Sequence, residues 1–211
     1  MKNKLLLTAS AAAQLLILPL LLNRTQLTQL TLSTWALIAM ALCLAWVNVS
    51  RDLRGLLPAL VLAGIGAWGT WRLLPLALAQ IALAALLASQ NLQKPLALSG
   101  WQLEVAFVQL LLLAQLNQLI TPQALLAVTF VTLPPLVAQW TPHLPWWATL
   151  ASQVLIAGLA VWQQSFTWVT AAIALLCGTG LSVKHRQLPP IATVWAGVLI
   201  SLVDVWTHLH G

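Results

Sequence analysis

The chain has 211 residues, of which 61% are hydrophobic and only 6% are charged. So few charged side chains could not cover the surface of a soluble domain of this length, and the composition therefore predicts a membrane protein. The net charge of +6 comes from lysines and arginines of the kind that lie in loops and orient membrane helices. We therefore expect no nucleic-acid partner.

Apolar segments follow one another along the whole chain. Continuous apolar runs without alternation predict helices, because a backbone in lipid must satisfy its own hydrogen bonds. We expect about nine short spans, within a range of seven to nine, and a single integral membrane domain over residues 1–211 with no soluble part. The fold class predicted is thus an all-α, polytopic transmembrane helical bundle. The nine segments are 5–22, 34–49, 56–71, 73–89, 98–120, 124–140, 146–162, 167–183 and 191–209.

The lysines and arginines of the loops favour a cytoplasmic N-terminus. With nine spans, seven of the nine cations fall on the side of the N-terminus, which is the side that positive charges favour. These seven are Lys2, Lys4, Arg51, Arg54, Lys94, Lys184 and Arg186, whereas Arg24 and Arg72 fall on the other side. The lipid bilayer is the expected partner, and a bacterial inner membrane is the expected location. The first span is interpreted as uncleaved, because its apolar run continues past the small residues at 9–13.

Two adjacent prolines lie inside the sixth predicted span. Pro134 and Pro135 together remove two backbone donors, so a kink or a break of the helix is expected there. Breaks of this kind line the transport sites of some carriers, and a plain packing kink is the alternative. We find no internal repeat in the sequence.

The fifth span carries an acid. A carboxylate at the centre of a span costs about 2.5–3.5 kcal/mol, so an acid in a span indicates a functional or structural role. On a helical wheel Glu104 shares a face with Gln115 and Gln118, whereas Gln102 and Gln109 lie on roughly the opposite side. Polar residues on two faces predict a helix that other helices surround.

The last span carries a second acid, Asp204. Thr193, Gly197, Ser201, Asp204 and His208 share one face of this helix, and we expect that polar face to pack against the bundle.

Glu104 and Asp204 are expected to differ in depth by roughly 10–15 Å, because one comes early and the other late in parallel helices. This separation is too long for a direct pair but fits two steps of a proton or solute path. The alternative is that both acids form polar contacts between helices. The candidate site residues are Glu104, Gln115, Gln118, Ser201, Asp204 and His208.

Two ligands, Asp204 and His208, do not make a metal site, so neither a metal nor another cofactor is expected. No HExxH, GxSxG or P-loop motif is present, and no catalytic residue is predicted.

The sequence leaves three functions open. The first is a non-enzymatic subunit or assembly component of a larger membrane complex, with other membrane proteins or a second copy as partner. The second is a small transporter or proton-conducting protein that uses Glu104 and Asp204. The third is a membrane-embedded enzyme acting on a lipid.

Overall fold

The structure, a computed structural model, describes residues 2–25, 30–90, 92–117, 120–140, 145–183 and 190–210. Over these residues the protein is all-α and has no strand, which confirms the predicted fold class. The α-helices are α1 (Lys2–Leu22), α2 (Leu32–Ser50), α3 (Leu56–Gly66), α4 (Leu74–Ser89), α5 (Lys94–Asn117), α6 (Pro122–Val137), α7 (Trp146–Trp162), α8 (Trp168–Val183) and α9 (Pro190–His210). Short 3₁₀ helices at Leu53–Gly55 and Trp71–Leu73 lead into α3 and α4.

Five segments are long and apolar enough to cross a bilayer. They are Lys4–Leu22, Leu32–Ser50, Trp71–Ser89, Pro95–Asn117 and Ile191–Leu209. The remaining apolar helices have 10–17 residues. A full crossing ordinarily needs about 20. The fold is therefore compatible with a multi-pass membrane protein, in which short helices lie beside long ones.

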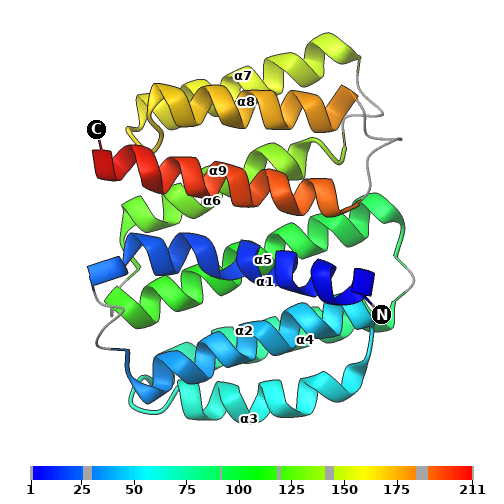
Figure 1. Cartoon of the computed structure of the whole chain (residues 1–211), viewed down its shortest axis with the longest axis vertical. Helices are drawn as coiled ribbons and strands as arrows, with labels where there is room; N and C mark the ends of the chain where they lie inside the picture. Colours follow the sequence, from blue (N-terminus) through cyan, green and yellow to red (C-terminus); the bar gives the residue numbers. More distant parts are fainter. Residues whose placement is uncertain are drawn as a thin grey trace.

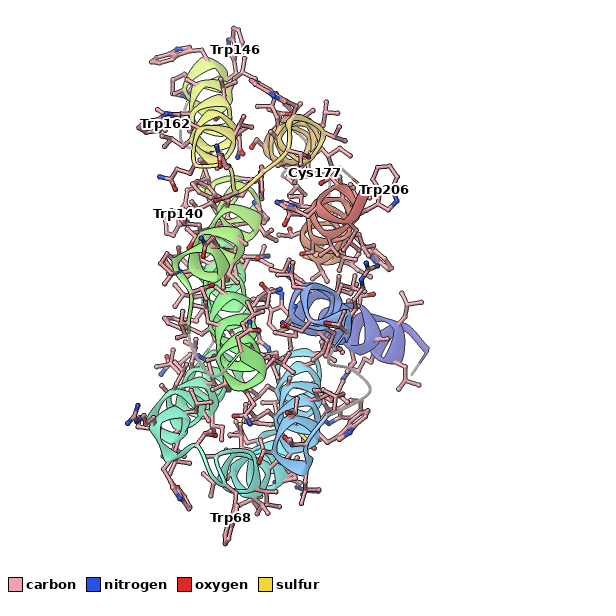
Figure 2. All side chains as sticks on the ribbon, turned by 90° about the vertical axis from the view of Figure 1, so that its left-hand side faces the viewer. Trp68, Trp140, Trp146, Trp162, Cys177 and Trp206 are labelled. Carbon is pink, nitrogen blue, oxygen red and sulfur yellow. The ribbon has the colours of Figure 1, made fainter. Side chains whose placement is uncertain are left out.

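The helices form two layers. Figure 2 shows α4, α5, α6 and α7 in one layer and α2, α1, α9 and α8 in the other, with α3 at the end where Trp68 lies. Across the layers α1 packs against α5, α2 against α4 and α5, and α6 against α8 and α9. Figure 1 shows the N- and C-termini at opposite ends of the helices. In this article the N side and the C side of the bundle are the ends where these termini lie.

Packing contacts repeat after four helices. Helix α2 packs against α3, α4 and α5, and α6 packs in the same way against α7, α8 and α9. The contact of α4 with α5 likewise corresponds to that of α8 with α9. No corresponding repeat is visible in the sequence.

Hydroxyl side chains and one glycine set several helix ends. The Thr31 and Thr121 hydroxyls accept hydrogen bonds from the amides of Thr34 and Ala124, and so cap α2 and α6. Gly69, at φ +86°, lies in the turn between α3 and α4, where a residue with a side chain would be strained. The two predicted segments 56–71 and 73–89 leave one residue between them, and the structure has a tight turn there.

A kink or a break is expected at the proline pair, and the break does not occur. Helix α6 continues through Pro134 and Pro135 to Val137, so both prolines lie in its last two turns. The amide of Ala138 donates to the Pro134 carbonyl, and the Gln139 side chain donates to the Pro135 carbonyl. Each proline lacks the amide that would donate to the carbonyl four residues earlier, so the pair removes two hydrogen bonds of α6 just before the helix ends.

Most tryptophan side chains lie on the outside. Figure 2 shows Trp68, Trp140, Trp146, Trp162 and Trp206 at the periphery of the molecule, and all five are exposed. Indole rings in such positions suit the boundary between lipid and water.

The described cations divide between the two ends of the bundle. Lys4, Arg51 and Arg54 lie on the N side, at the start of α1 and in the α2–α3 connection, whereas Arg24 and Arg72 lie on the C side. Lys184 and Arg186 are outside the described residues. The orientation of the N-terminus in a membrane stays a prediction.

Candidate functional site

A cluster of amide side chains lies between α1 and α5 in the middle of the bundle. Trp101 Nε1 donates to Gln14 Oε1 at 2.9 Å, and Gln14 Nε2 donates to Gln102 Oε1 at 3.2 Å. Gln109 Nε2 reaches the Gln14 carbonyl at 2.8 Å. The three glutamines are almost fully buried, yet Gln102 Nε2 and Gln109 Oε1 have no hydrogen-bond partner. Unpaired amide atoms in an apolar interior are costly, so they indicate a place for water or a polar solute.

Helix α9 approaches this cluster through a glycine. A Cβ atom at Gly197 would collide with the amide end of Gln14, so only a residue without a side chain leaves room for the glutamine. Ser201, one turn further along α9, is buried and donates its hydroxyl hydrogen bond to the Gly197 carbonyl. Together, Gln14, Leu18, Gln102, Gln109, Gly197 and Ser201 form what we call the central seam.

Glu104 is fully buried and faces α2. Its two carboxylate oxygens each accept from Asn48 Nδ2 at 2.9 Å, and the same Nδ2 also lies 3.0 Å from the Leu44 carbonyl. Because α5 begins at Lys94, Glu104 lies near the middle of its helix and deeper than the sequence indicated. The two faces of α5 thus have different partners, α2 for Glu104 and α1 for Gln102 and Gln109.

Asp204 has a different environment. Its side chain is 2% exposed, and its Oδ1 is 3.5 Å from His208 Nδ1. That nitrogen lies closer, 2.8 Å, to the backbone carbonyl of Asp204. Oδ1 has no hydrogen-bond partner in the described structure. The imidazole is thus directed mainly at the backbone, and the buried carboxylate retains an unused acceptor.

Asp204 and His208 line a cavity of about 470 Å³ on the C side, which we call the C-side cavity. Its other walls come from the ends of α1, α5 and α7 and from the start of α6. They are Leu22, Asn23, Leu113, Asn117, Thr121, Gln123, Ala124, Ala127, Gln163, Gln164 and Ser165. This volume lies within the range of pockets that bind small molecules, about 300–1,000 Å³.

A second cavity, of about 280 Å³, lies on the N side of the bundle, and we call it the N-side cavity. Helices α1, α2, α4, α5 and α9 contribute to it. Its walls are Leu7, Ala11, Asn48, Val49, Arg51, Leu87, Ala97, Leu98, Trp101, Ile191 and Val194.

The two cavities approach each other along the central seam. On α1 the N-side cavity reaches Ala11 and the C-side cavity begins at Leu22, a distance of about 16 Å along the helix. On α9 the corresponding residues are Val194 and Asp204, about 15 Å apart. The central seam occupies the interval, so only a few turns of side chains separate the cavities.

The predicted site residues do not form one cluster. Asp204 and His208 line the C-side cavity, and Ser201 lies one turn away in the central seam. Glu104 binds Asn48, and Gln115 accepts from the Thr70 hydroxyl near the α3–α4 turn. Gln118 is outside the described residues.

The sequence analysis missed Gln14 and Asn48. The signal for Gln14 is the pair Ser10 and Gln14, one turn apart on the first apolar helix. Trp101, which the sequence places near a span end, is buried and bonded to Gln14. The polar face of α9 is buried as its pattern predicts from Thr193 to Asp204, whereas His208 at its end is exposed, as are Leu199 and Trp206 on the other side.

Fold and site together define a helical bundle with apolar surfaces, a few polar side chains buried in an apolar interior and a cavity at each end. Comparison with protein-family models, with curated proteins and with solved structures finds no match.

Proposed function

We propose that the protein is a small transporter that moves a polar solute along the central seam. The observation that carries this proposal is the pair of cavities at opposite ends of the bundle. Residues of the same three helices, α1, α5 and α9, line both of them. Alternating access to one site needs two such openings and a short barrier between them.

The chemistry of the central seam, which separates the two cavities, supports this proposal. Gln102 Nε2 and Gln109 Oε1 are buried without partners, so a passing solute or water molecule that bonded them would recover part of their desolvation cost. Gly197 lets α1 and α9 lie close together, and small residues at helix contacts are typical of membrane helices. The four-helix repeat of packing adds to this, because many transporters consist of repeated halves.

The two buried acids, Glu104 and Asp204, have different roles in this proposal. Both Glu104 oxygens bind Asn48, which leaves this acid as a contact between α2 and α5. Of the two acids, Asp204 lines a cavity, and we assign the transport role to Asp204.

Cysteine labelling tests the proposal without knowledge of the solute. In a background with Cys43→Ala and Cys177→Ala, a cysteine is placed at Leu18, which is fully buried in the central seam. A membrane-impermeant thiol reagent is then added to either side of oriented vesicles. We expect Leu18→Cys to react slowly from both sides, since each cavity reaches the central seam in turn.

The matched control is Leu37→Cys, a buried leucine of α2 that packs on Gly66 away from the central seam. It should react from neither side. If Leu18→Cys is equally inert, or reacts from the C side alone, the transport proposal is wrong. An inert Leu18→Cys in a protein that co-purifies with other membrane proteins would favour the complex subunit instead.

A further inference from the structure

We infer that the C-side cavity binds a small organic cation, for which Asp204 is the counter-ion. This inference rests on the proposed function, because it names the class of solute that would pass along the central seam.

The charge of the cavity is the first argument. Asp204 is 1% exposed and lines the cavity, and its Oδ1 lacks a hydrogen-bond partner. No lysine or arginine is among the described residues that line this cavity. A buried carboxylate oxygen without a donor is costly, and a cation in the cavity would supply the missing interaction.

His208 does not remove this need. Its Nδ1 lies 2.8 Å from the Asp204 carbonyl oxygen and 3.5 Å from the carboxylate oxygen. The ring is also partly exposed, at 42%. A hydrogen bond to the backbone holds the imidazole beside the carboxylate rather than on it.

The remaining walls suit an organic molecule better than a bare metal ion. Amide and hydroxyl side chains of Asn23, Asn117, Gln123 and Ser165 offer both donors and acceptors, and Leu113 offers an apolar wall. Among the described residues no three His, Cys, Asp or Glu side chains come together to hold a metal. A volume of about 470 Å³ also exceeds what a single inorganic ion needs. An ammonium group with a short body that bears hydroxyl or methyl groups fits these walls.

The test compares ligands that differ in charge. Purified protein in mild detergent is titrated with choline and with ethanolamine, and its thermal unfolding temperature is followed. The neutral control is 3,3-dimethylbutan-1-ol, which has the shape of choline without its charge. Sodium chloride at equal ionic strength controls for inorganic cations. We expect a saturable rise with at least one amine and none with either control.

Variants locate the binding. Asp204→Asn should weaken amine binding by about tenfold or more, the effect of losing about 1.4 kcal/mol, whereas Asp52→Asn, in an exposed loop, should not change it. Should Asp204→Asn fail to fold, Ala127→Phe fills the cavity without altering the acid and should also abolish binding.

Three results would overturn the inference: no saturable shift with either amine, an equal shift with the neutral alcohol or with salt, or unchanged binding in a folded Asp204→Asn (in Ala127→Phe, should Asp204→Asn fail to fold). This experiment can fail separately from the transport proposal. If Leu18→Cys is labelled from both sides but no amine binds, the transport proposal stands and only the inference of a cationic solute is wrong. If an amine binds but Leu18→Cys is inert, the binding site in the C-side cavity stands and the transport proposal is wrong.

Discussion

Replacing Asn48 by leucine is expected to destabilise the bundle, because it leaves the Glu104 carboxylate without its donor. Glu104 is fully buried, and Asn48 Nδ2 lies 2.9 Å from each of its oxygens. Leucine has the same number of side-chain heavy atoms and the same branching as asparagine, so Asn48→Leu removes the hydrogen bonds without opening a cavity.

The magnitude follows from the number of bonds. Leaving a buried acceptor without its donor costs about 1–3 kcal/mol for each bond lost. The two hydrogens on Asn48 Nδ2 are shared among three acceptors, the two carboxylate oxygens and the Leu44 carbonyl. We therefore count between one and two strong bonds and expect Asn48→Leu to lower the free energy of unfolding by about 2–4 kcal/mol.

A double-mutant cycle separates this pair from general disruption. Glu104→Leu leaves the Asn48 amide on the Leu44 carbonyl and should cost about 1 kcal/mol or less. The double variant Asn48→Leu with Glu104→Leu should recover most of the stability lost in Asn48→Leu, because no buried acid remains unpaired.

The assay is reversible unfolding in mixed micelles by titration with SDS, followed by circular dichroism. Thr129→Val, which removes a hydroxyl bonded to the Leu125 carbonyl of its own helix, is the control and should change stability by about 0.5 kcal/mol or less. The reasoning is refuted if Asn48→Leu is as stable as the parent protein, or if the double variant is no more stable than Asn48→Leu alone.

Two glycines allow further tests by the same assay. Gly197→Ala should displace the Gln14 amide and cost about 1–2 kcal/mol, because the hydrogen bonds of that amide are strained or lost. An unchanged stability would mean that the Gln14 side chain adopts another rotamer without losing its hydrogen bonds. Gly178→Ala should displace Gln153, which donates to a carbonyl of α6, at about 1 kcal/mol. In contrast, Gly158→Ala meets nothing within 4 Å and should stay within about 0.5 kcal/mol of the parent; a larger loss would show that alanine itself disturbs these helices.

The apolar residues determine much of this protein by themselves. Runs of leucine, alanine and valine predict helices in nearly their observed places, because each run must satisfy its backbone locally in an apolar medium. The pattern of α9 also predicts which side is buried, since Thr193, Ser201 and Asp204 recur at helical spacing. The two polar faces of α5 likewise predict a helix with neighbours on several sides, and it packs against α1, α2, α4 and α6.

The tertiary structure alone decides which polar groups meet. Glu104 and Asp204 look equivalent in the sequence, as single acids inside apolar helices. Packing gives Glu104 the Asn48 amide from a helix 56 residues away in the chain, whereas Asp204 lines a cavity. Likewise, Gln14 binds Trp101 and Gln102 across 87 and 88 residues. Helical periodicity shows which face of a helix is polar but not which partner covers it, because a partner depends on how the helices cross. The difference between a structural acid and a candidate binding acid is therefore a property of the assembled bundle.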